Sequence, residues 1–93
     1  MTQESKNDWE AGRVVATCGA ADGLDPEDVH QALGRHFARD WGECTPEDWQ
    51  ANDEALLAGW RVLSVHRDRQ GAKFWILTEA DRSVTTVLLP EEY

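Results

Sequence analysis

The fold is decided by residues 60–93, WRVLSVHRDRQGAKFWILTEADRSVTTVLLPEEY. Three runs in this stretch, at 60–67, 72–79 and 83–89, are rich in β-branched and aromatic residues and are typical of strands. The segments between them hold turn-forming residues, including Gly71 in the first and Asp81 in the second. Pro90 cannot donate a backbone hydrogen bond, so the last strand should end before it. The pattern predicts a three-stranded antiparallel meander.

The lengths of the two turns determine which side chains share a face of this sheet. If each turn has four residues, one face is entirely apolar and should form the core. Its members are Leu63, Val65, Phe74, Ile76, Val87 and Leu89. The other face carries Val62, Ser64, His66, Lys73, Trp75, Leu77, Thr86 and Leu88. Its centre is too apolar to be left bare, so either the N-terminal segment or another molecule should cover it.

Two helices are predicted upstream of the sheet. Asp25 and Thr45 are the expected N-caps, because each precedes a proline and two acidic residues, which suit the first turn of a helix. The first helix should run to about residue 39, and the second should end at Gly59. Apolar residues at helical spacing should face the sheet. They are Val29, Leu33, Phe37 and Trp41 in the first helix, and Trp49, Leu56, Leu57 and Trp60 in the second. Asn52 falls among the latter and needs a hydrogen-bond partner if it is buried.

Residues 13–18, RVVATC, form a short apolar run that periodicity alone cannot assign to a strand or a helix. Its β-branched residues favour a strand, which would pair with a free sheet edge or cover Trp75. Residues 1–12 are polar and should be mobile. We therefore expect a single α+β domain at residues 13–93, with two helices packed on a three- or four-stranded antiparallel sheet.

Charge is distributed unevenly along the chain. The net charge is −9, and all of the excess falls on residues 1–59, which hold thirteen acidic and four basic residues. Such a surface repels nucleic-acid phosphates and favours basic partners, although it also serves solubility alone. No run is apolar and long enough to span a membrane, and no signal peptide is expected because residues 1–10 lack the basic and apolar regions of one. Cys18 and Cys44 are expected to be free thiols, and the sequence predicts a cytoplasmic protein.

No metal or cofactor site is predicted. His30 and His36 are six residues apart and lie on different sides of a helix, and no Cys-x-x-Cys, EF-hand, P-loop or dinucleotide motif occurs. One catalytic alternative arises on the sheet, because a metal-free ribonuclease needs a base, an acid and a cation. Its residues would be His66, Arg82, Thr85 and Thr86. His66 and Glu79 would lie at opposite ends of the first hairpin, which weighs against a shared site.

Protein binding is the interpretation that we favour. Five tryptophans are more than so small a core can hide, and Trp75, followed by Trp9, is the best candidate for a partner contact. The predicted binding residues are Trp75, Leu77, Leu88 and Val62 on the sheet and Glu47, Asp48, Asp53 and Glu54 on the second helix. The partner would be a nucleic-acid-binding host protein, or a second copy of the chain paired through the Trp75 face. Direct binding of nucleic acid or of a membrane is not expected.

Four segments resemble a known family: VVATCGA at 14–20, DWG at 40–42, AND at 51–53 and, above all, WILTEADRSVTTVLLP at 75–90. From residue 14 to residue 93 the chain is similar to small proteins carried by bacterial plasmids and integrated mobile elements, although Cys18 stands where that family would have proline. The resemblance implies a cytoplasmic accessory of mobile DNA and assigns no catalytic residue. Small acidic proteins of such elements often inhibit host restriction or CRISPR systems by mimicking the phosphates of DNA, and the negative charge of residues 1–59 suits such an anti-defence role here.

Overall fold

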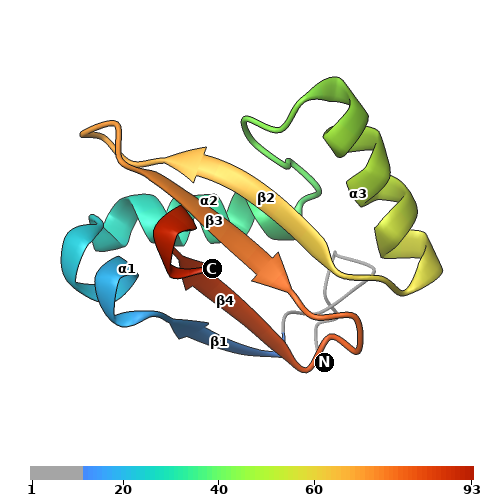
Figure 1. Cartoon of the computed structure of the whole chain (residues 1–93), viewed down its shortest axis with the longest axis horizontal. Helices are drawn as coiled ribbons and strands as arrows, with labels where there is room; N and C mark the ends of the chain where they lie inside the picture. The colour runs from blue at the N-terminus through green and yellow to red at the C-terminus, as the bar shows by residue number, and fades with distance from the viewer. Residues whose placement is uncertain (1–11) are drawn as a thin grey trace, which may run out of the picture.

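The computed structural model describes residues 12–93, and the expectation for residues 1–11 lies outside them. Four strands form one sheet, with three α-helices and a short 3₁₀ helix around it (Figure 1). Their bounds in chain order are β1 Arg13–Ala16, α1 Cys18–Gly23, α2 Pro26–Phe37, α3 Pro46–Ala58, β2 Val62–Arg67, β3 Lys73–Thr78, β4 Val84–Leu88 and η1 Pro90–Glu92. The fold is therefore α+β, as predicted.

The sheet is mixed rather than strictly antiparallel. Its strand order is β1-β4-β3-β2, and β1 runs parallel to β4 while the other two pairs are antiparallel. The β-branched run thus forms a strand that pairs with a free sheet edge, which was one of the two expected outcomes. The strand ends before Thr17, whose side chain accepts a hydrogen bond from the Ala20 amide and caps α1. The sequence pattern did not predict this short helix.

Both predicted helix starts are correct, because the side chains of Asp25 and Thr45 cap α2 and α3 and a proline follows each cap. α2 ends at Phe37, two residues earlier than expected. Gly59 ends α3 with a φ of 82°, a conformation that favours glycine. α2 covers one face of the sheet, whereas α3 lies alongside β2 (Figure 1).

The β2–β3 hairpin differs from the predicted register by one residue. The Asp68 amide donates to the Ala72 carbonyl at 3.0 Å, and Asp68 Oδ1 accepts from the Ala72 amide. This pairing leaves a loop of three residues with Gly71 at a φ of 83°, so the side chains of β2 face the opposite way from the prediction. Val62, Ser64 and His66 point toward α2, and Leu63 and Val65 point away from it. The β3–β4 hairpin has the expected four-residue loop at 80–83.

The hydrophobic core lies between α2 and the sheet and continues toward α3. Its larger part consists of Ala20, Leu24, Ala32, Phe74, Ile76 and Val87. A second part surrounds the fully buried Trp41, which packs with Ala55 and Val62. In the described chain, none of the helices combines the length and the apolar character that crossing a membrane requires.

Candidate functional site

The outer surface of α3 is acidic. Glu47, Asp48, Asp53 and Glu54 are all exposed, as the predicted binding role requires, and the helix contains no lysine or arginine. Within residues 12–93 no basic side chain forms an ion pair with any of these four carboxylates. The helix therefore presents uncompensated negative charge to solvent.

The acidic start of α2 is different, because a cation neutralises it. Arg69 lies 3.0 Å from Glu27, 3.0 Å from Asp28 and 3.3 Å from Asp25. Hydrogen bonds from the Arg69 side chain and amide hold the pKa of Asp28 below its usual range. The two helices begin with the same sequence signal, yet only α3 leaves its carboxylates available to a partner.

Two large apolar side chains are exposed at the C-terminal end of α3. Leu57 is 83% exposed and Trp60 is 63% exposed, so the prediction that both face the sheet is wrong. Leu56 and Leu57 are adjacent and about 100° apart around the helix, and only Leu56 packs into the core. No sequence signal indicated this exposure, because two adjacent apolar residues fit the width of an ordinary buried stripe.

Arg82 and Asn52 fix the position of α3. Arg82 donates to the carbonyls of Trp60 at 2.8 Å and of Leu56 at 3.3 Å, at the end of the helix where cations are favourable. The Asn52 side chain donates to the Leu63 carbonyl at 2.8 Å and accepts from the Leu63 amide at 3.0 Å. The predicted requirement for an Asn52 partner is confirmed, and the acidic surface is held on a rigid support.

The predicted apolar surface around Trp75 is mostly buried. Trp75 is partly exposed and its ring contacts Tyr93 edge to face, with centroids 5.6 Å apart. Leu77 and Leu88 share its face of the sheet but are only 7% and 4% exposed. Val62 lies on the opposite face and is fully buried, because the hairpin register differs from the prediction. Trp9, the second tryptophan candidate, lies outside the described residues.

A chain of five polar side chains crosses the core between α2 and the sheet. His36 Nδ1 lies 2.7 Å from Ser64 Oγ, and His36 Nε2 lies 2.9 Å from Thr78 Oγ1. His66 Nε2 extends the chain at one end, 2.8 Å from Ser64 Oγ, and Thr85 Oγ1 extends it at the other, 2.8 Å from Thr78 Oγ1. All five residues are at most 1% exposed, so the network is closed to solvent.

The hydrogen-bond direction along this network follows from one unpartnered atom, the buried Nδ1 of His66. A buried bare acceptor costs less than a buried N–H without a partner, which assigns the proton of His66 to Nε2. His66 then donates to Ser64, Ser64 to His36, and His36 to Thr78. Burial lowers the pKa of His36 to about 3 and that of His66 to about 4, so both rings are neutral at pH 7.

The residues of the ribonuclease alternative do not face a common open space. His66 and Thr85 are buried in the polar network, whereas Thr86 lies on the opposite face of the sheet. Arg82 is bonded to the carbonyls at the end of α3. In residues 12–93, moreover, no group of three or more His, Cys, Asp and Glu side chains could hold a metal ion, and both cysteines are free.

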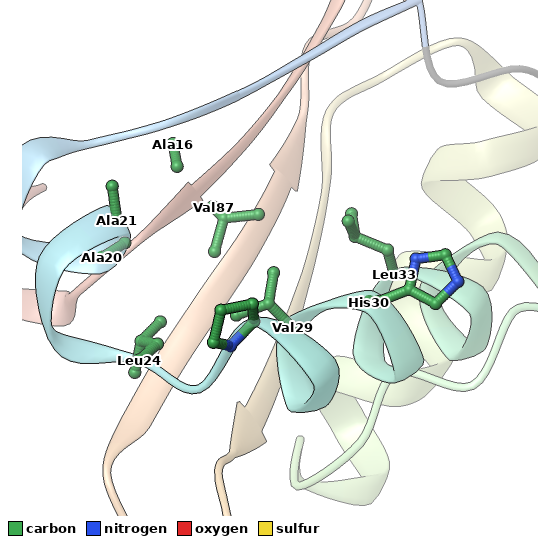
Figure 2. Close-up of a pocket in the computed structure, with 9 residues that line it drawn as sticks. Ala16, Ala20, Ala21, Leu24, Val29, His30, Leu33 and Val87 are labelled. Carbon is green, nitrogen blue, oxygen red and sulfur yellow. The ribbon is translucent and has the colours of Figure 1, made fainter.

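An apolar hollow of about 240 Å³ lies between β1, α1 and α2 (Figure 2). It is lined from the sheet by Ala16 and Val87, from α1 by Ala20 and Ala21, and from α2 by Pro26, Val29, His30 and Leu33. No sequence signal pointed to this hollow. A comparison of the chain with family models, curated proteins and solved structures finds no match.

Proposed function

We propose that the chain is a small binding protein without catalytic activity and that its α3 surface docks on a basic partner protein. The observation that carries this proposal is a set of four exposed carboxylates on α3 that form no ion pair within residues 12–93, beside the exposed Leu57 on the same helix and Trp60 just beyond its end. Charged groups steer a partner toward the surface, and buried aromatic and aliphatic side chains supply most of the affinity.

The α3 surface matches the expected chemistry of a basic protein that normally holds nucleic acid. Its carboxylates occupy positions around one rigid helix, and a net charge of −9 repels nucleic acid itself. The resemblance to accessory proteins of mobile elements supports a host restriction or CRISPR component as the partner. In that role the carboxylates of α3 would compete with phosphates for the same basic groups.

The test compares a surface variant with a matched control. The combination Glu47→Gln, Asp48→Asn and Glu54→Gln removes three exposed charges from α3, and Asp22→Asn, Glu79→Gln and Glu91→Gln removes three charges elsewhere. Quantitative capture from a bacterial lysate should identify basic proteins that the α3 variant loses by at least tenfold and that the control retains. Equal capture by both variants would show that α3 is not the docking surface.

Two outcomes would replace this proposal with the alternatives. Cleavage of RNA by the purified chain that is abolished in His66→Ala would establish the ribonuclease function. A dimer in sedimentation that becomes a monomer in Trp75→Ala would establish a homodimer through the Trp75 face. The α3 proposal instead expects no cleavage and no change of mass in these two variants.

A further inference from the structure

Within residues 12–93, the outer edge of the sheet at β1 has backbone hydrogen-bonding groups without a partner. The Arg13 amide donates to the Ser83 carbonyl at 3.1 Å and the Thr17 amide donates to the Val87 carbonyl at 3.0 Å. Because backbone groups alternate in direction along a strand, the amides and carbonyls of Val14 and Ala16 point away from β4. Within residues 12–93 nothing pairs with them, and both residues are exposed.

The hollow between α1 and α2 opens beside this edge (Figure 2). Ala16 pairs with Val87, so the two side chains share the face of the sheet that lines the hollow. A strand added outside β1 would send every second side chain to that same face. A cavity of about 150 Å³ already holds benzene, so a hollow of about 240 Å³ accommodates one branched or aromatic side chain.

Charge identifies the kind of strand that fits. Asp22, Asp25 and Glu27 adjoin lining residues of the hollow in the sequence, and Arg13 is the only basic residue of β1. Asp22 is exposed and has no ion pair within the described chain, unlike Asp25 and Glu27, which share Arg69. A second copy of the chain would bring another net charge of −9 to this site, whereas a basic segment would be attracted.

We propose that an extended, basic segment of a partner protein adds to β1 as a fifth strand and places one apolar side chain in the hollow between α1 and α2. Backbone hydrogen bonds to Val14 and Ala16 supply the pairing, as in other complexes formed by strand addition. The hollow selects the apolar side chain, and the exposed Asp22 together with the net charge of −9 favours lysine or arginine at neighbouring positions. This site is separate from α3 and does not depend on the function proposed for it.

The test uses a display library of random ten-residue peptides selected on the wild-type chain. Val14→Pro removes an outward amide without removing a bond to β4, and Ala16→Leu fills part of the hollow. The α3 variant Glu47→Gln, Asp48→Asn, Glu54→Gln is the matched control. Circular dichroism melts confirm that each variant is folded before it is used.

The expected result is a set of peptides with alternating apolar residues and an excess of lysine and arginine. Their affinity should fall at least tenfold for Val14→Pro and for Ala16→Leu and should change less than twofold for the α3 variant. In amide hydrogen exchange, a bound peptide should slow Val14 and Ala16 selectively. Absence of enriched peptides, or peptides that bind the edge variants as tightly as wild type, would overturn the proposal. A dimer in sedimentation that Val14→Pro dissociates would also overturn it, in favour of a second copy.

Discussion

The two edges of the sheet are treated in opposite ways. At β2 the edge is covered, because the Asn52 side chain bonds both backbone groups of Leu63, and residues 41–43 bond those of Val65. The Val65 amide donates to the Trp41 carbonyl at 3.1 Å, and the Glu43 amide donates to the Val65 carbonyl at 2.8 Å. At β1 no described residue provides such a cover.

The covered edge at β2 contributes to the stability of the fold, whereas the open edge at β1 can pair with another chain. Unpaired sheet edges invite pairing with other chains, and proteins usually block them with charges, proline, bulges or covering segments. The cover on β2 comes from α3 and its preceding loop, so it also joins the second part of the core to the sheet. Changes at β2 should therefore lower the free energy of unfolding, whereas changes at β1 should leave it almost unchanged.

The largest effect is expected for Gly42→Ala, which breaks the covered edge. Gly42 has a φ of 72°, and an added Cβ would lie 1.9 Å from the Val65 carbonyl oxygen. Relief requires the covering segment to move off β2, and the free energy of unfolding should fall by more than about 4 kcal/mol. Gly71→Ala is the matched control, because its φ is 83° but nothing lies within 4 Å of the added atom. Urea denaturation should give a loss of only about 1 kcal/mol there, and equal losses would refute the contact with Val65.

Asn52→Leu should have the next largest effect. It removes both side-chain hydrogen bonds to Leu63, so the amide loses its Asn52 partner and the carbonyl keeps only the weak hydrogen bond from Cys44 Sγ at 3.6 Å. The expected loss is about 3 kcal/mol in urea denaturation. Gln50→Ala, an exposed change on the same helix, should cost less than about 0.5 kcal/mol. An unchanged stability of Asn52→Leu would show that the amide does not cover the edge.

Lowering the pH should reduce the free energy of unfolding through the two buried histidines, His36 and His66. Burial lowers the pKa of His36 to about 3 and that of His66 to about 4, whereas both titrate near 6.5 in the unfolded chain. The unfolded state therefore binds more protons between pH 6.5 and pH 4, so stability is complete above this window and falls as the pH decreases. Between pH 6 and pH 5 the free energy of unfolding should drop by about 2 kcal/mol.

Two variants separate the buried histidines from other titrating groups. His30 is exposed, so His30→Gln should leave this pH dependence unchanged, while His66→Gln should reduce it by about half. Hydrogen bonds lower the pKa of carboxylates such as Asp28 and Glu92, so their contribution to stability is lost only toward the acid end of this window and below it. A stability that is flat from pH 6.5 to pH 4 would contradict the neutral network.

The smallest effect is expected at the open edge. Val14 is 45% exposed, and its amide points away from β4, so Val14→Lys should change the free energy of unfolding by less than about 0.5 kcal/mol. The matched substitution on the covered side, Val62→Lys, places a charge in a fully buried position and should lower the free energy of unfolding by about 3 kcal/mol. Similar urea midpoints for the two variants would remove the distinction between the edges.

Local signals in the sequence predicted much of this fold. The caps at Asp25 and Thr45, the end of α3 at Gly59 and the β3–β4 loop depend on a few neighbouring residues, and each was correct. The prediction for the β2–β3 loop was wrong because Asp68 pairs with Ala72, which leaves three loop residues instead of four. A glycine in the loop is compatible with either length. The difference of one loop residue reversed every side chain of β2 and moved Val62 and His66 into the core.

The sequence predicted a candidate surface only where that surface depends on residues close together in the chain. The four carboxylates of α3 are exposed, which could be anticipated because charges on a helix with such a start signal usually face solvent. The hollow depends on β1 lying beside α1 and α2, and the polar network joins residues far apart in the chain. The exposure of Leu57 and Trp60 depends on where α3 sits relative to β2, which periodicity does not specify.

The parallel pairing of β1 with β4 also affects the chain during its translation. The partner of β1 is β4, about 70 residues downstream, so β1 leaves the ribosome well before the strand with which it pairs. Pairs so distant in sequence form late in folding. A nascent chain that stops before Val84 would hold β1 without its internal partner, exposed to chaperones and to neighbouring nascent chains.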